Sequence, residues 1–209
     1  MANKKANPPA YSYVGKSAPR IEGEKKVSGQ ALYTADHVLP GTVWGKVLRS
    51  PYPHARIMSV NSERAKAHAG VLAVLTAADI PEVLTGRRLR DMPMLASDRV
   101  RFIGEKVAVV AAVERDVAEE AAQLIDVEYE PLTPVFDPLA AITEGAPELH
   151  KCLAEYQGLP RIGTPPKNTY SHEEWLLGDV ERGFREADQI FEDYFATQHV
   201  HQTYLEPHS

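Results

Sequence analysis

Short segments in which apolar and polar residues alternate recur between residues 42 and 132, a pattern typical of β-strands. The longest apolar run, residues 107–113, predicts a strand that is buried on both faces. Residues 127–132 also alternate, but Pro131 has no N–H to donate to a ladder, so this segment predicts an edge strand. Further strands are predicted at residues 42–48, 56–60, 71–75 and 99–103.

Two segments with helical spacing lie between these strands. Residues 63–69 predict a short helix that Asn61 or Ser62 caps and Gly70 ends. Residues 116–125 predict a second helix with Asp116 as its cap, because their apolar positions recur at helical intervals. Each helix is flanked by strands, which gives two βαβ-like units whose crossovers would be right-handed if the strands were parallel. The predicted fold class is α+β with a mixed sheet.

Proline and polar residues divide the chain into four parts. Residues 1–19 are polar and aperiodic and predict an extended N-terminal arm, and residues 20–136 hold the α+β domain. Residues 137–177 predict a proline-rich connector, because prolines prevent long regular elements there. Residues 178–209 predict the start of a second domain: a short helix at 178–187 capped by Asp179, then a strand at 189–198 that no later element covers, so we expect this domain to be incomplete.

The composition is that of a folded, soluble protein, with 44% hydrophobic and 25% charged residues. The longest apolar run is far shorter than the roughly 20 residues that a membrane-spanning helix needs. A formal net charge of −6 excludes a field that would attract nucleic acid or anionic lipid. The local basic run Arg87-Arg88-Leu89-Arg90 is followed by Asp91, and it predicts a solvated loop or a partner contact.

Cys152 is the single cysteine, so the chain forms no intramolecular disulfide and no multi-cysteine zinc or iron-sulfur site. No base lies near it in the sequence, which argues against a catalytic thiol. Residues 1–9 contain two lysines but neither an apolar stretch nor paired arginines, so no export signal is visible. We therefore expect a cytoplasmic protein.

His199 and His201 are the strongest candidates for metal ligands. On a strand their rings would face the same side, and Glu206 or His208 could complete a site with three or four ligands. The alternative is that these residues pack and hydrogen-bond within a domain core. We favour the alternative, because no third ligand stands at a fixed offset from the pair.

The segment Ser50-Pro51-Tyr52-Pro53-His54-Ala55-Arg56 offers a histidine and an arginine in a turn that prolines stiffen. It could contact a substrate or a partner, but we favour a structural role in which Arg56 pairs with a carbonyl or a carboxylate. Glu105 follows Gly104 and is interpreted as a turn residue on a solvated face rather than an acid–base group. Glu128 and Glu130 alternate with apolar residues, which places both acids on one exposed strand face.

Eight segments, in order along the chain, resemble the opening of the molybdenum-binding subunit of the xanthine dehydrogenase and aldehyde oxidase family. Eight collinear segments are far more specific than one short motif. They are VGK and PRI at 14–21, VSGQALYTAD at 27–36, LPG at 39–41, LRSPYPHARI at 48–57, GV with LTAADIP at 70–81, FIGEKVA at 102–108, VEYEPL at 127–132 and GDV at 178–180.

The resemblance implies a hammerhead domain followed by the first part of the domain that holds molybdopterin. Family members hydroxylate aldehydes or N-heterocycles and pass electrons to iron-sulfur and FAD centres on other domains or partner subunits. The family's glycine-rich cofactor loop, substrate-facing Arg and late catalytic Glu match no part of this sequence. Tyr204-Leu205-Glu206-Pro207 resembles the segment with which the family enters the molybdenum domain, but Val200 stands where xanthine oxidase-like members have a Gln that approaches the metal.

The resemblance therefore implies no catalytic residue and no metal ligand in this chain, and it leaves the cofactor-binding residues unknown. The expected function is the N-terminal portion of a molybdenum hydroxylase subunit, with a structural and subunit-packing role. The expected partners are the remainder of the molybdenum subunit and the iron-sulfur and flavin subunits, with no nucleic acid and no membrane. Two alternatives stay open: a non-catalytic interaction module, and a small metal-binding protein that uses His199 and His201.

Overall fold

The structure is a computed structural model that describes residues 11–87, 89–150, 156–157, 167–171, 175 and 177–204. It divides into two compact units, one spanning Gly41–Asp193 and the other combining Met1–Pro40 with Tyr194–Ser209. The second of these units holds two short helices among its described residues, α1 (Gly23–Val27) and the 3₁₀ turn η1 (Thr34–Asp36). Cys152, Arg88, Glu206 and His208 lie outside the described residues.

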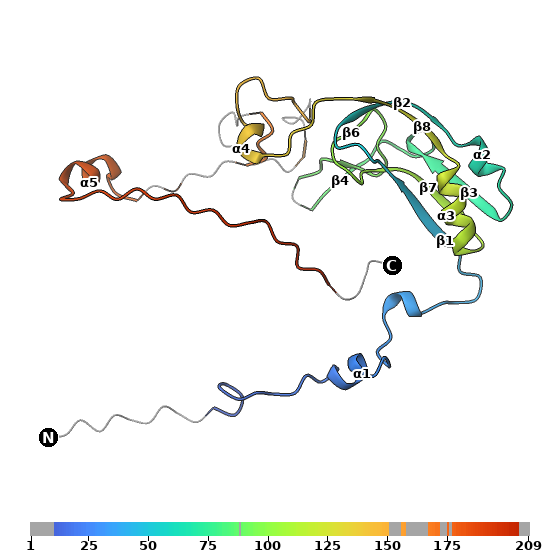
Figure 1. Cartoon of the computed structure of the whole chain (residues 1–209), viewed down its shortest axis with the longest axis horizontal. Helices are drawn as coiled ribbons and strands as arrows, with labels where there is room; N and C mark the ends of the chain where they lie inside the picture. The colour runs from blue at the N-terminus through green and yellow to red at the C-terminus, as the bar shows by residue number, and fades with distance from the viewer. Residues whose placement is uncertain are drawn as a thin grey trace. The chain divides into compact units, whose positions relative to one another are not determined.

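Two small antiparallel sheets form the body of the unit Gly41–Asp193 (Figure 1). The first has the order β1 (Trp44–Arg49), β7 (Lys106–Ala112), β3 (Val71–Thr76), so β7 is its central strand. The second has the order β6 (Arg99–Val100), β2 (Ala55–Asn61), β8 (Asp126–Pro131). Strand β8 therefore lies at an edge, as its proline predicts.

Helix α3 (Arg115–Gln123) packs on β1 and β7, and the short helix α2 (Glu63–Lys66) packs on β3 and α3. The side of α3 that faces the sheet consists of Ala118, Ala121 and Ala122, all buried. Because these side chains are small, the helix lies close to the strands. Lys46 of β1 reaches across to Glu119 of α3 at 3.1 Å, which fixes the face of the sheet that α3 covers.

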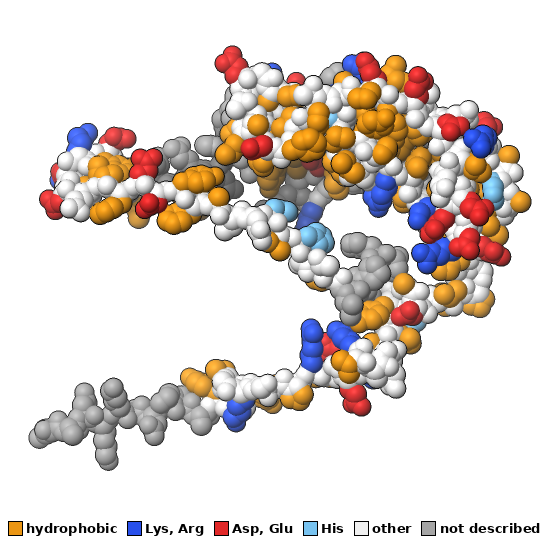
Figure 2. Space-filling model, viewed as in Figure 1, with side chains coloured by type: hydrophobic (Ala, Val, Ile, Leu, Met, Phe, Trp, Pro, Cys, Tyr) orange, Lys and Arg blue, Asp and Glu red, His pale blue; other side chains and the backbone are white. Residues whose placement is uncertain are grey.

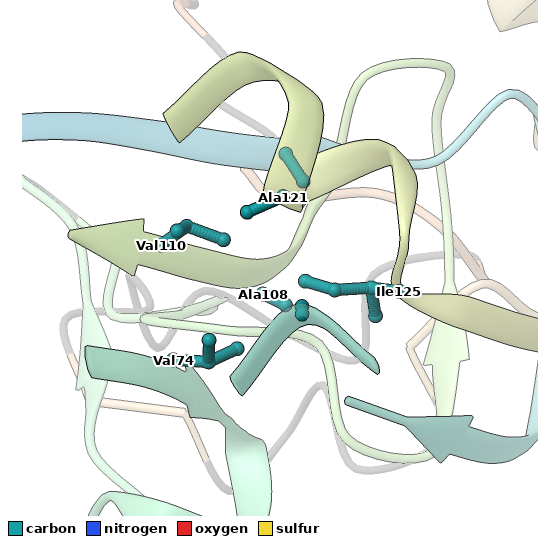
Figure 3. Packing of buried hydrophobic residues seen from close by; sticks show 7 residues of the cluster. Val74, Ala108, Val110, Ala121 and Ile125 are labelled. Atoms are coloured by element: carbon teal, nitrogen blue, oxygen red, sulfur yellow. The ribbon is translucent and has the colours of Figure 1, made fainter. Parts of the chain in front are cut away.

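The larger core cluster lies between α3 and the first sheet (Figure 3). Val110 and Ala108 of β7 point into it together with Val74 of β3, Ala121 of α3 and Ile125. Successive side chains of a strand point to opposite faces, so Val107 belongs to a different cluster. This second cluster joins β7 to the second sheet and consists of Ala55, Ala96, Val100 and Val107.

The burial predicted for residues 107–113 is confirmed on one face of β7 and is incomplete on the other. Ala108, Val110 and Ala112, on the face that α3 covers, are fully buried. On the opposite face Val107 is buried as well, but Val109 and Ala111 are only half-buried. The central strand therefore has one closed face and one partly open face.

The α+β class is confirmed, and both predicted strand–helix–strand sequences are present. However, the strands that flank each helix do not pair with each other, because α2 and α3 each connect one sheet to the other. Strand β2 precedes α2 in the second sheet, whereas β3 follows it in the first. Every sheet pairing among the described residues is antiparallel, so the expected handedness of a parallel crossover does not apply.

The helix caps follow the sequence in part. The Asn61 side chain accepts from the Glu63 N–H at 3.1 Å, whereas the Ser62 hydroxyl caps nothing in α2. Helix α3 begins at Arg115, so Asp116 lies in its first turn and is not its cap. Helix α5 (Val180–Glu186) begins as predicted, with Asp179 accepting from the Arg182 N–H at 2.9 Å. Gly70, at φ +88°, lies in the turn before β3, because α2 has already ended at Lys66.

Two predicted strands are shorter or absent. Of residues 99–103 only Arg99–Val100 form a strand, because the chain then turns back toward β7. Residues 189–198 form no strand with any described residue. A strand is defined by its ladder, and alternation along one segment supplies only one side of it.

Short elements complete the described fold: the 3₁₀ turn η2 (Ala77–Asp79), the pair β4 (Leu84–Thr85) and β5 (Met92–Pro93), and α4 (Pro138–Ala141).

Asn168 holds part of the connector together, since its side chain donates to the carbonyls of Ala141 and Pro147 and accepts from the Leu149 N–H. Among the described residues no helix is long and apolar enough to cross a membrane.

Candidate functional site

The turn at Ser50 is bonded to the turn at Gly104. The Ser50 N–H donates to the carbonyl of Glu105 at 2.9 Å, and the Gly104 N–H donates back to the carbonyl of Ser50 at 2.8 Å. The guanidinium of Arg49 adds a third bond, to the Gly104 carbonyl at 2.9 Å. The buried Ser50 hydroxyl accepts from the Tyr52 N–H, which closes the proline turn on itself. Two turns distant in sequence are therefore held as one rigid corner.

His54 anchors the proline turn to the strand end at Thr133. Its side chain is only 4% exposed, and its Nδ1 lies 2.7 Å from the Thr133 carbonyl. A carbonyl only accepts, so Nδ1 carries a proton. Nε2 is buried without a partner among the described residues. The structure thus uses His54 to join β2 to the segment after β8, in line with the structural role that we favoured.

The interpretation of Glu105 as a turn residue on a solvated face is wrong. The residue is 5% exposed, and its carboxylate accepts from the backbone N–H of Arg101 and from the Arg101 guanidinium, with Nη1 at 3.4 Å. Burial raises the pKa of Glu105 above its usual value, and the contacts with Arg101 oppose that rise only in part. The carboxylate is turned inward because it satisfies the backbone of the turn that it closes.

Asp98, Arg99 and Arg101 form a charged cluster with Glu105, which we call the Arg-carboxylate cluster; Arg99 and Glu105 are buried in it, whereas the Asp98 side chain is 58% exposed. Arg99 is buried, and its Nε donates to Asp98 at 2.9 Å, while Arg101 lies 3.5 Å from the same carboxylate. Burial acts to raise the pKa of Asp98, but the hydrogen bond from Arg99 and the charges of both arginines outweigh it and lower that pKa. Two cations thus balance two anions at the corner between the sheets.

Sequence reasoning missed this cluster, because Arg99 and Arg101 were interpreted only as part of a strand. The available signal was a pair of arginines two positions apart, which a strand turns toward the same face. Together with an acid at each end of residues 98–105, that spacing already offers two cations for two carboxylates. The pattern alone gave no sign that the face would be buried.

The connector approaches the cluster through His150. Burial, together with the charges of Arg101 and Arg99, lowers the pKa of His150, and the charge of Asp91 opposes this. The His150 ring packs edge-on against Tyr156 with ring centres 5.6 Å apart, and its Nδ1 lies 3.2 Å from the Tyr156 hydroxyl. Both residues belong to the connector, so these two contacts hold the connector to itself.

The basic run at residues 87–91 is only partly the solvated loop that we expected. Arg87 and Arg90 are exposed, but Leu89 is 7% exposed and belongs to the core. Arg90 contacts the connector through two bonds to Gln157, one from its backbone N–H to the Gln157 carbonyl at 3.0 Å. The loop therefore contacts another part of its own chain.

The exposed strand face predicted for Glu128 and Glu130 is confirmed. Arg56 of β2 pairs with Glu130 of β8 at 2.8 Å, with both side chains about half exposed. Ser59 donates to Glu128 at 3.3 Å on the same face. Arg56 therefore pairs with a carboxylate, one of the two kinds of partner that we expected, and this carboxylate lies on the neighbouring strand.

His199 and His201 are exposed, and His201 accepts from the Thr203 N–H at 3.1 Å. Among the residues that the structure describes, no three His, Cys, Asp or Glu side chains gather as a metal site would require. The remaining two candidates, Glu206 and His208, lie outside that part of the chain. The described geometry therefore gives the two histidines no shared ligand role.

Two pockets on the described surface lie at different places and are both lined mainly by apolar side chains. One lies between α5 and the residues that follow it, lined by Val180, Phe184, Ile190 and Phe191 among others, and hydrophobic side chains are visible there in Figure 2. The other lies beside η2 and is lined by Ile80, Val83, Met94 and Leu95, with Glu82 as its one ionisable side chain. Neither lining pairs an acid with a base, so neither pocket supports proton-transfer chemistry.

A comparison with known protein families decides what kind of domain this is. The family model described as "Aldehyde oxidase and xanthine dehydrogenase, a/b hammerhead domain" matches residues 28–133. The chain belongs to the aldehyde oxidase and xanthine dehydrogenase family. The matched range contains both sheets, α2, α3 and the whole Arg-carboxylate cluster, whereas His150, His199 and His201 lie outside it.

Individual members of the aldehyde oxidase and xanthine dehydrogenase family match beyond that range. A probable xanthine dehydrogenase subunit of Bacillus subtilis is 37% identical over 191 residues, which cover 91% of this chain and 24% of that protein. The nicotinate dehydrogenase large molybdopterin subunit of Eubacterium barkeri is 34% identical over 198 residues, which cover 94% of this chain and 43% of that protein.

The solved structure of quinoline 2-oxidoreductase from Pseudomonas putida 86 matches with 40% identity and a TM-score of 0.55. The match covers 65% of this chain and 18% of that one. This chain therefore spans about a quarter to less than a half of the length of these curated relatives. The resemblance of the eight segments and the hammerhead fold that it implied are both confirmed.

Proposed function

We propose that the chain is the N-terminal portion of the molybdenum-binding subunit of a xanthine dehydrogenase or aldehyde oxidase-like hydroxylase. The observation that carries the proposal is the family match over residues 28–133, because it coincides with the two sheets and their helices. The curated relatives extend the similarity to more than nine-tenths of the chain. On this basis, residues 20–136 are the hammerhead domain, 137–177 the connector and 178–209 the start of the molybdopterin domain, preceded by an arm at 1–19.

The role proposed for the chain is structural: it packs against the rest of the subunit and supplies no catalytic residue. Neither described pocket fits a molybdopterin. That cofactor carries a phosphate, which proteins hold with backbone N–H groups and cationic side chains. Both described pockets are lined mainly by apolar side chains, and the arginines of the Arg-carboxylate cluster are already paired with Asp98 and Glu105. We therefore assign no residue of this chain to the cofactor.

The complete enzyme would carry molybdopterin-bound molybdenum in the remainder of the subunit, with iron-sulfur and FAD centres on partner subunits. It would oxidise an aldehyde or an N-heterocycle in the cytoplasm. The 209-residue chain alone would be inactive. Support for these statements comes from the family membership and from the molybdopterin and xanthine dehydrogenase subunits among its relatives.

The test is to purify the native protein from its source under mild conditions, identify the polypeptides that accompany it and measure molybdenum by elemental analysis. We expect molybdenum, together with sequence that supplies the remaining length of the relatives, and oxidation of aldehydes or N-heterocycles by that assembly. A solitary chain without molybdenum would refute the proposal and favour an interaction module.

A matched variant addresses the metal-binding alternative. In H199A/H201A we expect no loss of zinc, copper, nickel or iron relative to the unmodified 209-residue chain, because these exposed histidines share no ligand site in the described residues. Loss of a stoichiometric transition metal in this variant alone would support the alternative. Arg56→Ala, on an exposed strand face, is the control for a general effect of substitution.

A further inference from the structure

The described residues cover the face of the first sheet opposite α3 only in part. Directly opposed residues of antiparallel strands share a face. Val109 of β7 is opposite Val47 of β1 and Leu75 of β3, which forms one row across all three strands. Ala111 is opposite Gly45 and Ala73, which forms a second row. Lys46 lies between these rows in sequence and pairs with Glu119 of α3, so the two rows point away from that helix. We call the six residues the open sheet face.

The open sheet face is apolar and partly exposed to solvent. Leu75 is 43% exposed, Gly45 and Ala73 are exposed, and Val47, Val109 and Ala111 are half-buried. On the α3 side of the same central strand, Ala108, Val110 and Ala112 are fully buried. None of the six positions carries an ionisable or hydrogen-bonding side chain. A contiguous apolar surface without polar groups is typical of a surface that another protein segment covers.

We propose that the open sheet face is the docking surface for the portion of the molybdenum subunit that lies outside these 209 residues. This inference rests on the function proposed above. The Bacillus subtilis relative has roughly three-quarters of its length, and the Eubacterium barkeri relative more than half, outside the region that this chain matches. A sheet with apolar residues on both faces is stable in water when both faces are covered, and α3 covers only one.

The residue types specify what the occupant presents. The row Gly45, Ala111, Ala73 has no side chain larger than a methyl group, so the backbone of another segment can approach it closely. The taller row Val47, Val109, Leu75 borders it and continues toward Val107, which the second sheet already covers. The occupant therefore presents an apolar segment that packs into the low row and against the tall one, and it brings no charge to this face.

The experiment is cysteine protection in the native assembly. Cys152 is replaced by serine, and a single thiol is introduced either as Leu75→Cys on the open sheet face or as Glu63→Cys on α2, where the side chain is 79% exposed. We expect a maleimide to label Leu75→Cys about tenfold or more slowly than Glu63→Cys, because buried cysteines are inert. Both thiols should react equally fast in urea. Equal rates in the native assembly would overturn the proposal.

Molybdenum content measured in the same preparations separates this inference from the proposed function. A molybdenum-containing assembly in which Leu75→Cys labels freely refutes the docking surface alone. A chain without molybdenum or further sequence refutes both, because the occupant would not exist.

A photo-reactive residue at position 75 identifies the occupant. We expect cross-links from this position to sequence outside the 209 residues. Cross-links to a second copy of this chain, or only to positions within the 209 residues, would overturn the assignment of the occupant. Glu63, substituted in the same way, reports the background of random cross-linking.

Discussion

Replacing Arg101 by methionine removes the cation that faces the buried carboxylate of Glu105. The two side chains are 15% and 6% exposed, and Nη1 lies 3.4 Å from Oε1. At an effective dielectric constant of about 20, that separation corresponds to an attraction of about 5 kcal/mol. Most of the attraction is offset by the cost of removing both ions from water. The net effect of the substitution therefore depends on what Glu105 does without its partner.

Without Arg101, the pKa of Glu105 rises further, because the contacts that opposed the effect of burial are gone, and the carboxyl group keeps its proton up to a higher pH. Each pH unit above the reference value of 4.5 adds about 1.36 kcal/mol to the cost of keeping that proton. Removing one partner of a buried ion pair costs about 3–5 kcal/mol where the other group stays charged, and protonation of Glu105 lowers this cost as the pH falls, so the loss in R101M should be larger at pH 7 than at pH 5. Between 4.5 and the raised pKa the native variant holds a proton that the unfolded chain lacks, so its stability falls as pH rises through this range.

The assay is urea unfolding at pH 5, 6 and 7, followed by the fluorescence of Trp44 in β1. The double variant R101M/E105Q is the control, because it has no titrating group at position 105 and should lose the pH dependence. E105Q alone should gain stability relative to the unmodified protein as pH rises from 4.5, because burial already raises the pKa of Glu105. A loss in R101M that is equal at pH 5 and pH 7 would contradict the reasoning.

Four further substitutions test the packing and one surface ion pair. Val110→Ala, at a fully buried position between the sheet and α3, should lower the unfolding free energy by about 2 kcal/mol in the same assay, and a loss below about 0.5 kcal/mol would argue against the core as described. Gly70→Ala should lower the unfolding free energy more than Gly104→Ala. Both glycines have φ near +90°, and alanine in that conformation costs about 1 kcal/mol of stability at either position. A Cβ at Gly70 would in addition lie 3.1 Å from the Val113 side chain, whereas a Cβ at Gly104 would have no atom within 4 Å. Arg56→Ala should change stability by about 0.5 kcal/mol or less, because the pair with Glu130 is half exposed, and a larger loss would show that the pair is coupled to the core.

The elements that local pattern dictates were predicted well. The apolar run at 107–113 became the central strand β7, and the alternating segment with Pro131 became the edge strand β8. The cap of α5 at Asp179 also followed from sequence, because a cap is a contact between residues three positions apart. Each of these features depends on a few neighbouring residues, which a single sequence contains.

Features that depend on pairing between distant segments were not predicted. A strand, a helix and a strand in succession are compatible with one parallel sheet or with two sheets joined by the helix, and the sequence of 56–75 does not distinguish them. The burial of Glu105 likewise depends on where the turn at Gly104 meets the turn at Ser50. His150, which feels the charges of Arg101 and Arg99, lies in the connector, and the connector contacts the α+β domain where Arg90 bonds to Gln157.

The prediction that β7 is buried on both faces links the sequence to the proposed assembly. Val109 and Ala111 are as apolar as their neighbours, yet they are only half-buried, while Ala108, Val110 and Ala112 are closed under α3. A strand that faced water on one side would show alternating polar residues, as β8 does with Glu128 and Glu130. The uniform run in β7 is instead the pattern of a strand with cover on both sides. The described residues supply one of those covers, and protection of position 75 in the native assembly measures the other.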